Sequence, residues 1–235
     1  MSLLSIAQAV AEEIGAFDAP TSIVGSQDRT SRQLLRLINR EGRQLAKRSW
    51  AILQKENTFT ADGSAYVALP VDFGWLLDET VWDRDNFWKM RGSLNASEWQ
   101  IYKSGLGTSV ATRLRFRIKP LANTNKLYFD PTPASGLNGV FEYVSSQWVT
   151  NSGGTVFNTG YEADTDVSLL AEELIEMGAL WRFKASKGLA YAEEFNEYQR
   201  AADTAFARDG GKPILNMGAH RIPDSRINVP QTGFG

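Results

Sequence analysis

Basic side chains recur along one face of a helix expected between about residue 28 and residue 53. They follow one another every three or four residues, and they are Arg29, Arg32, Arg36, Arg40, Arg43 and Lys47. Residues three or four apart are neighbours on a helix, so this spacing places all of them on one side. Guanidinium groups bind both carboxylates and phosphates, so this basic row is suited to an acidic protein surface or to nucleic-acid phosphates. The same pattern also fits a solvated helix face without a partner.

An acidic segment of the same chain offers a surface of opposite charge. Between residues 162 and 176 there is no basic residue, and the acids are Glu162, Asp164, Asp166, Glu172, Glu173 and Glu176. Two opposite patches on one chain suit head-to-tail association of copies into a ring. We therefore predict that the basic row and Glu172, Glu173 and Glu176 contact a neighbouring subunit or another protein. The two patches could equally pair with each other inside one chain.

Composition excludes several kinds of chemistry. The 235 residues include no cysteine and a single histidine, His220, so thiolate metal sites, disulfides and multi-histidine metal sites cannot form within one chain. Carboxylates are too numerous for any pair to stand out as catalytic. The formal net charge of −2 argues against a protein whose main role is to coat nucleic acid. We expect no enzymatic activity, no catalytic residue, no metal and no cofactor.

A second group of basic residues alternates with apolar ones. Arg113, Arg115, Arg117 and Lys119 are interleaved with Leu114, Phe116 and Ile118. A period of two predicts a strand with one buried face and one face in solvent. We interpret the basic face as a charged outer surface that resists aggregation, with contact to DNA or a partner as the alternative.

Helical periodicity is strongest near the two ends of the chain. Residues Leu3 to Ile14 predict a helix that ends at Gly15, and a longer one follows Ser26 or Asp28 and runs to Leu53. A third helix is expected to begin after Asp164 or Asp166 and to end at Gly188. A fourth carries apolar residues from Tyr191 to Ala205.

Between these helices the sequence is typical of short strands. β-prone runs at 65–69, 76–82, 113–119, 126–129 and 140–149 are separated by Gly, Pro, Asn and Asp, and a short helix is expected at 95–102. The predicted fold is α+β, a four-helix core from both chain ends with a small antiparallel β insertion and an extended C-terminal arm. The N-terminal helices of the core are expected in residues 1–55 and its C-terminal helices in residues 151–208. The β-rich insertion is residues 56–150, and the extended docking arm is residues 209–235.

The last segment, residues 209–235, is rich in glycine and proline and keeps spaced hydrophobic residues. This candidate docking arm carries Ile214, Leu215, Met217, Ile222, Ile227, Val229 and Phe234. Glycine and proline disfavour a helix, and the hydrophobic residues are too sparse for a core. We predict that they anchor the arm on another protein. No apolar run approaches the ~20 residues of a membrane span, and no export signal is expected at the N-terminus.

Several motifs resemble the head-to-tail adaptor, or connector, proteins of tailed double-stranded DNA phages. They are Leu37–Arg43 followed by Trp50, Leu69–Phe73, Phe141–Ser145, Asp164–Asp166 and Trp181–Tyr191. The resemblance implies a structural virion protein that forms a ring, typically of about twelve copies, beneath the portal and connects the capsid to the tail. Implied partners are further copies of the chain, the portal protein, tail proteins and genomic double-stranded DNA that passes without sequence-specific contact. The implied location is the neck of the virion, after assembly in the host cytoplasm. The resemblance implies no contact with a membrane and no cofactor.

Two other functions stay open at this point. One is a DNA-binding module that uses the row from Arg29 to Lys47, which would lose duplex affinity steeply with salt. The other is a virion-associated peptidoglycan hydrolase, whose cell-wall turnover would be abolished by one glutamate substitution.

Overall fold

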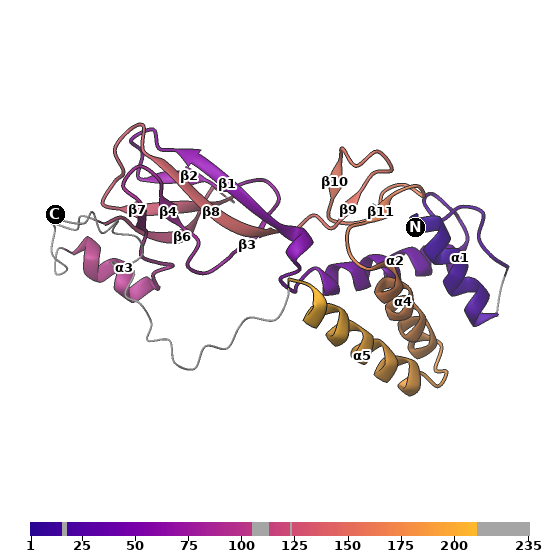
Figure 1. Cartoon of the computed structure of the whole chain (residues 1–235). Helices are drawn as coiled ribbons and strands as arrows, with labels where there is room; N and C mark the ends of the chain where they lie inside the picture. The colour runs from indigo at the N-terminus through magenta and orange to yellow at the C-terminus, as the bar shows by residue number, and fades with distance from the viewer. Residues whose placement is uncertain (16–17, 105–112, 123, 211–235) are drawn as a thin grey trace, which may run out of the picture. The chain divides into compact units, whose positions relative to one another are not determined.

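A computed structural model describes residues 1–15, 18–104, 113–122 and 124–210 of the chain. These residues form two compact units (Figure 1). The helical unit contains Met1–Asn57, Leu69–Leu77 and the described residues from Phe141 on. The sheet unit contains Thr58–Ala68 and Asp78–Val140.

Helix α1 ends at the predicted glycine, and helix α2 begins after one of its two predicted capping residues. Helix α1 (Leu3–Ile14) ends at Gly15, whose φ of 61° is the left-handed conformation that glycine tolerates. Helix α2 (Arg29–Leu45) begins after Asp28, whose carboxylate accepts a hydrogen bond from the Ser31 amide at 2.7 Å. This hydrogen bond satisfies an amide that has no partner within the helix.

Helix α2 ends earlier than the predicted Leu53. The Trp50 indole Nε1 donates a hydrogen bond to the Leu45 carbonyl at 2.8 Å, where the helix stops. Residues Ala51–Leu53 then form a short 3-10 helix, η1. The buried Trp50 side chain therefore turns the chain out of the helix at a point that apolar periodicity alone does not mark.

The third predicted helix begins later than expected. Residues Val167–Ser168 form strand β11, and helix α4 (Glu172–Ser186) starts only after Ala171. The expected capping role of Asp164 and Asp166 is wrong, because both carboxylates bind loop amides elsewhere. Helix α5 (Ala192–Arg208) follows α4 and agrees with the fourth predicted helix.

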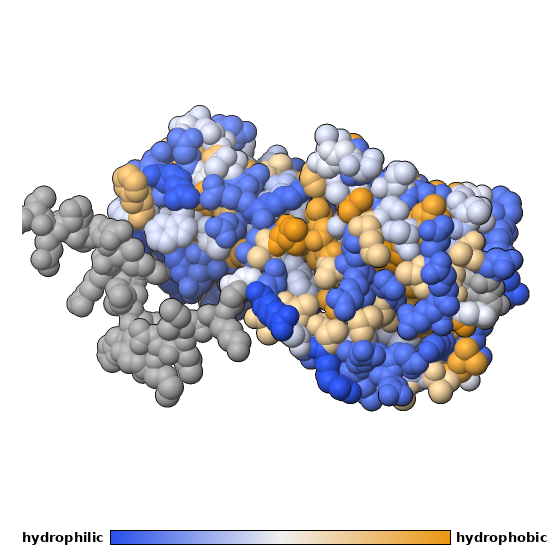
Figure 2. All heavy atoms as spheres, turned by 45° about the vertical axis from the view of Figure 1, so that its right-hand side comes forward, coloured by the Kyte–Doolittle hydropathy of each residue, from blue (hydrophilic) through white to orange (hydrophobic). Residues whose placement is uncertain are grey.

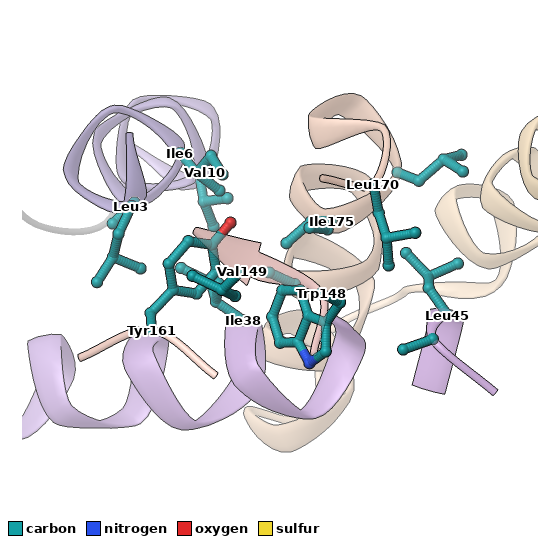
Figure 3. Packing of buried hydrophobic residues seen from close by; sticks show 14 of the residues in the cluster. Leu3, Ile6, Val10, Ile38, Leu45, Trp148, Val149, Tyr161, Leu170 and Ile175 are labelled. Atoms are coloured by element: carbon teal, nitrogen blue, oxygen red, sulfur yellow. The ribbon is translucent and has the colours of Figure 1, made fainter. Parts of the chain in front are cut away.

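Trp148 is fully buried in the core of the helical unit, among side chains from α1, α2 and α4 (Figure 3). Next to it, strands β9 (Val149–Thr150), β10 (Phe157–Asn158) and β11 form a small antiparallel sheet in the order β10-β9-β11. A Cβ atom on Gly42 would lie 1.9 Å from the Trp148 ring, so only glycine allows the indole to pack against α2. One aromatic side chain thus joins the small sheet to the helices.

Two larger antiparallel sheets complete the described fold. One has the order β1-β8-β4-β5, with β3 also paired to β8, and its strands are β1 (Gln54–Thr60), β3 (Phe73–Leu76), β4 (Trp82–Asp83), β5 (Trp88–Lys89) and β8 (Asn138–Ser145). The other belongs to the sheet unit and has the order β2-β7-β6, with strands β2 (Tyr66–Ala68), β6 (Arg115–Leu121) and β7 (Thr124–Asp130). The predicted short helix is α3 (Ala96–Lys103), which begins with a capping box between Asn95 and Glu98.

The expected four-helix core with a small β insertion is wrong. The described residues contain five α-helices and eleven strands in three antiparallel sheets, so the fold is α+β but rich in strands. One of the sheets lies inside the helical unit itself. Several strands have only two residues, too few to show an alternating pattern in sequence. The predicted arm beyond residue 210 lies outside the described residues, and the predicted part boundaries stay predictions.

Among the residues that the structure describes, no helix is long and apolar enough to span a membrane. Hydrophilic and hydrophobic residues both reach the surface on the face in Figure 2. Two of the most exposed large apolar side chains are Val71 and Phe87.

Candidate functional site

The basic row lies on the exposed side of α2. All six predicted residues, Arg29, Arg32, Arg36, Arg40, Arg43 and Lys47, are exposed to solvent. The opposite side of the helix is buried through Leu34, Ile38 and Leu45. Because this apolar side is fixed in the core, the helix presents its cations outward in a defined array.

No acid of the described chain neutralises the basic row. Among the described ion pairs, none includes any of its six members. Lys47 Nζ donates to the amide oxygen of Gln44 at 3.3 Å, which leaves its charge in place. Arg29, Arg32 and Arg36 line an open hollow of about 570 Å³ together with Gln33. The row therefore keeps its positive charge available to a partner.

The predicted acidic residues of α4 divide into two environments. The Glu172 carboxylate lies against the terminal amine of Met1. Glu173 is exposed, and Glu176 is half-buried on the same helix. Burial raises the pKa of Glu176, and the nearby carboxylates of Glu13 and Glu173 raise it further. Glu13, Glu173 and Glu176 thus form an acidic patch, of which sequence analysis had missed Glu13.

The basic row and the acidic patch do not pair within the described chain. The ion pairs within the helical unit run between other residues of its helices and loops, for example from Arg48 to Asp203 at 3.0 Å. Two opposite patches therefore coexist on one unit, and neither compensates the other.

The segment that carries the middle of the basic row also fastens α2 to the rest of the unit. Glu41 is completely buried, accepts a hydrogen bond from Arg182 Nε at 2.6 Å, and contacts the Tyr198 hydroxyl. Asn39 Oδ1 accepts a hydrogen bond from the Tyr161 amide at 2.8 Å. Inward-pointing residues at 39, 41 and 42 thus alternate with outward-pointing Arg40 and Arg43. Glu41 is spaced with Ile38 and Leu45 on the apolar side, and this spacing is the signal that could have identified it.

Asp72, from the Leu69–Phe73 motif, joins three parts of the helical unit. Its carboxylate binds Lys55 Nζ at 2.7 Å and accepts hydrogen bonds from the Tyr143 and Ser145 hydroxyls, both at 2.9 Å. Burial opposes ionisation, but these three hydrogen bonds and the Lys55 charge together lower the pKa of Asp72 below its ordinary value. Asp72, which directly precedes β3, thus links this strand to β1 and β8.

The second predicted basic group does not form a simple solvent-facing surface. Arg115, Arg117 and Lys119 of β6 are half-buried, and aromatic rings of α3 lie against two of them. The expectation of a fully solvent-exposed strand face is therefore wrong, because α3 packs against part of it. Arg113 is exposed, with its guanidinium 5.8 Å from the Trp88 ring.

Apart from its first two residues, the candidate docking arm lies outside the described residues. This applies to Ile214, Leu215, Met217, Ile222, Ile227, Val229 and Phe234, and also to His220. The last described part of the chain ends close to η1, where the Asp209 carboxylate accepts a hydrogen bond from the Ala51 amide.

Comparison with known proteins gives one family. The sequence model of the family described as SU10 adaptor protein matches residues 1–221, most of the chain. No curated protein matches the sequence.

Proposed function

The chain belongs to the SU10 adaptor protein family, and we propose that it forms a head-to-tail ring that docks beneath the portal and connects the capsid to the tail around the DNA exit channel. Membership supports a structural, non-enzymatic adaptor of a phage virion. The ring, the contact with portal and tail proteins, the position in the neck and assembly in the host cytoplasm are the finer parts of the proposal.

The observation that carries the proposal is the uncompensated charge of α2. An array of like charges three and four residues apart is unfavourable in an isolated helix, and the described chain does not neutralise it. The acidic patch of Glu13, Glu173 and Glu176 supplies the opposite charge on the same unit. A surface that binds a different surface on an identical copy forms a heterologous contact, and such contacts generate a ring when the rotation between neighbouring copies closes.

Mass measurement of the assembled protein tests the proposal. Native mass spectrometry of the full chain should give a closed ring, and Arg36→Glu/Arg40→Glu should give folded monomers, because the reversal leaves the melting temperature of the monomer itself nearly unchanged. The matched control is Arg200→Glu/Arg208→Glu, which reverses two exposed charges on α5 and should leave the ring intact. A ring of normal size from the α2 variant would contradict the role of the basic row.

The arm is the second part of the proposal. With residues 212–235 deleted, we expect a folded chain that still forms rings but no longer binds a portal ring in the same measurement. Extended, a segment of this length reaches up to roughly 80 Å, enough to cross to another protein. Normal portal binding by the truncated chain, or its unfolding, would contradict the docking role.

A further inference from the structure

The sheet unit has a basic surface of its own, which the proposed ring contact does not use. Alternate residues of β6 point to the same side of the sheet, so Arg115, Arg117 and Lys119 share one face. Lys119 pairs across the strands with Lys126 of β7, and cross-strand partners lie on the same side. Together with Lys103 at the end of α3, these residues make up the β6 face.

Aromatic rings hold several of these cations in place. The Arg115 guanidinium lies 3.8 Å from the centre of the Tyr102 ring. Lys119 Nζ lies 4.2 Å from the Tyr128 ring and 5.0 Å from the Trp99 ring. Such cation–π contacts fix the position of a charge without neutralising it. The β6 face therefore holds half-buried cations in fixed positions, with rings of α3 against Arg115 and Lys119 and, among the described residues, no ring of α3 against Arg117 or Lys126.

The positive charge of the β6 face is largely uncompensated. Asp130 binds Lys103 at 2.7 Å and lies 3.8 Å from Arg115. Within the described part of the chain, no acid forms an ion pair with Arg117, Lys119 or Lys126.

Burial, together with repulsion between these cations, disfavours the charged form of Lys119. Burial lowers the pKa of Lys119, and the nearby charges of Arg117 and Lys103 lower it further. Like charges directly opposite each other, as at Lys119 and Lys126, destabilise a sheet. An anionic ligand bound to the β6 face would offset this repulsion between the cations.

We infer that the β6 face binds the phosphate backbone of double-stranded DNA and does not read its bases. Its cations follow one another along β6 at intervals of about 6.6 Å, so they form a regular line rather than a pocket. A regular line of fixed cations fits a repeating polyanion. In the proposed ring the acidic patch is already occupied by the basic row, so a second copy does not supply the complement. The inference rests on the proposed function in one respect, because that function brings DNA to the protein.

Fluorescence anisotropy with a labelled DNA duplex of mixed sequence tests the inference on the full chain. We expect binding at about 50 mM salt that weakens as the salt concentration rises. Arg117→Gln/Lys119→Gln should weaken binding at least about tenfold and reduce the slope of log affinity against log salt by about 2, because each lost phosphate contact removes about one from that slope. Its melting temperature should be unchanged or higher, because repulsion on the face is relieved.

Control variants separate this inference from the proposed ring contact. Arg200→Gln/Arg208→Gln removes two exposed charges from α5 and should bind DNA like the unmodified chain. Arg36→Glu/Arg40→Glu should lose the ring but keep the salt-dependent affinity. The inference is overturned if the unmodified chain fails to bind the duplex, or if Arg117→Gln/Lys119→Gln binds it equally well. It is also overturned if that variant loses ring formation with DNA affinity intact, since the face would then bind an acidic protein surface.

Discussion

Replacing Glu41 should weaken the helical unit more than any exposed substitution on α2. The Glu41 side chain is fully buried, and the Arg182 side chain that binds it is only 13% exposed. Glu41→Met leaves the guanidinium without a carboxylate in the protein interior, and breaking a buried pair in this way costs about 3 to 5 kcal/mol of unfolding free energy. For a chain of this length, that corresponds to a fall in melting temperature of about 6 to 20 °C.

The double variant Glu41→Met/Arg182→Met distinguishes the net contribution of the ion pair to the unfolding free energy from the cost of leaving one buried charge unpaired. Removing both charges leaves neither buried alone, so the double variant should be clearly more stable than Glu41→Met. Urea unfolding followed by circular dichroism measures Glu41→Met, Arg182→Met and the double variant against the unmodified chain, with exposed Glu197→Met on α5 as the matched control. The reasoning is refuted if Glu41→Met loses less than about 1 kcal/mol, or if the two single losses simply add.

Three further substitutions test the packing and the turns. Gly42→Ala should lower the unfolding free energy by about 3 kcal/mol in urea titrations, because its new methyl group would overlap the Trp148 ring. Asp72→Asn should cost about 2 kcal/mol at pH 7. Because the folded-state pKa of Asp72 is lowered, its contribution to stability is fully present above pH 3.8 and is lost as the pH falls from there through that lowered pKa, so the difference in stability between the variant and the unmodified chain should narrow steadily below pH 3.8. Phe87 is 82% exposed with a φ of 58°, so Phe87→Asn should raise the unfolding free energy by about 1 kcal/mol, and a loss of stability would show that the ring contributes to packing.

Local signals in the sequence predicted the features that depend on neighbouring residues. The stop at Gly15, the cap at Asp28 and the helix after Asn95 agree with the structure because each depends on hydrogen bonds within a few residues. The exposure of the basic row follows for the same reason, from helical spacing and the apolar residues opposite. Whether that row contacts a partner stays a prediction.

Features that depend on distant partners could not be predicted in this way. Glu41 contacts Tyr198, which is 157 residues away, and its burial follows from that contact and from Arg182. Asp164 precedes a helical pattern, yet its carboxylate binds the Val24 amide at 2.8 Å. The basic side of β6 shows a clear alternation, but the rings that cover it come from α3, whose packing no local pattern encodes.

Native mass spectrometry of two complementary variants tests the ring contact most directly. Arg36→Glu/Arg40→Glu reverses the two central charges of the basic row, and Glu173→Lys/Glu176→Lys reverses two of the three charges of the acidic patch. In each protein alone, every contact between copies brings reversed charges against charges of the same sign, so each should remain monomeric although folded by circular dichroism. Mixed in equal amounts, they restore complementary charge at every contact and should form rings that contain both proteins in equal number. Rings formed by either variant alone, or a mixture that stays monomeric, would contradict the pairing of α2 with α4 between neighbouring copies.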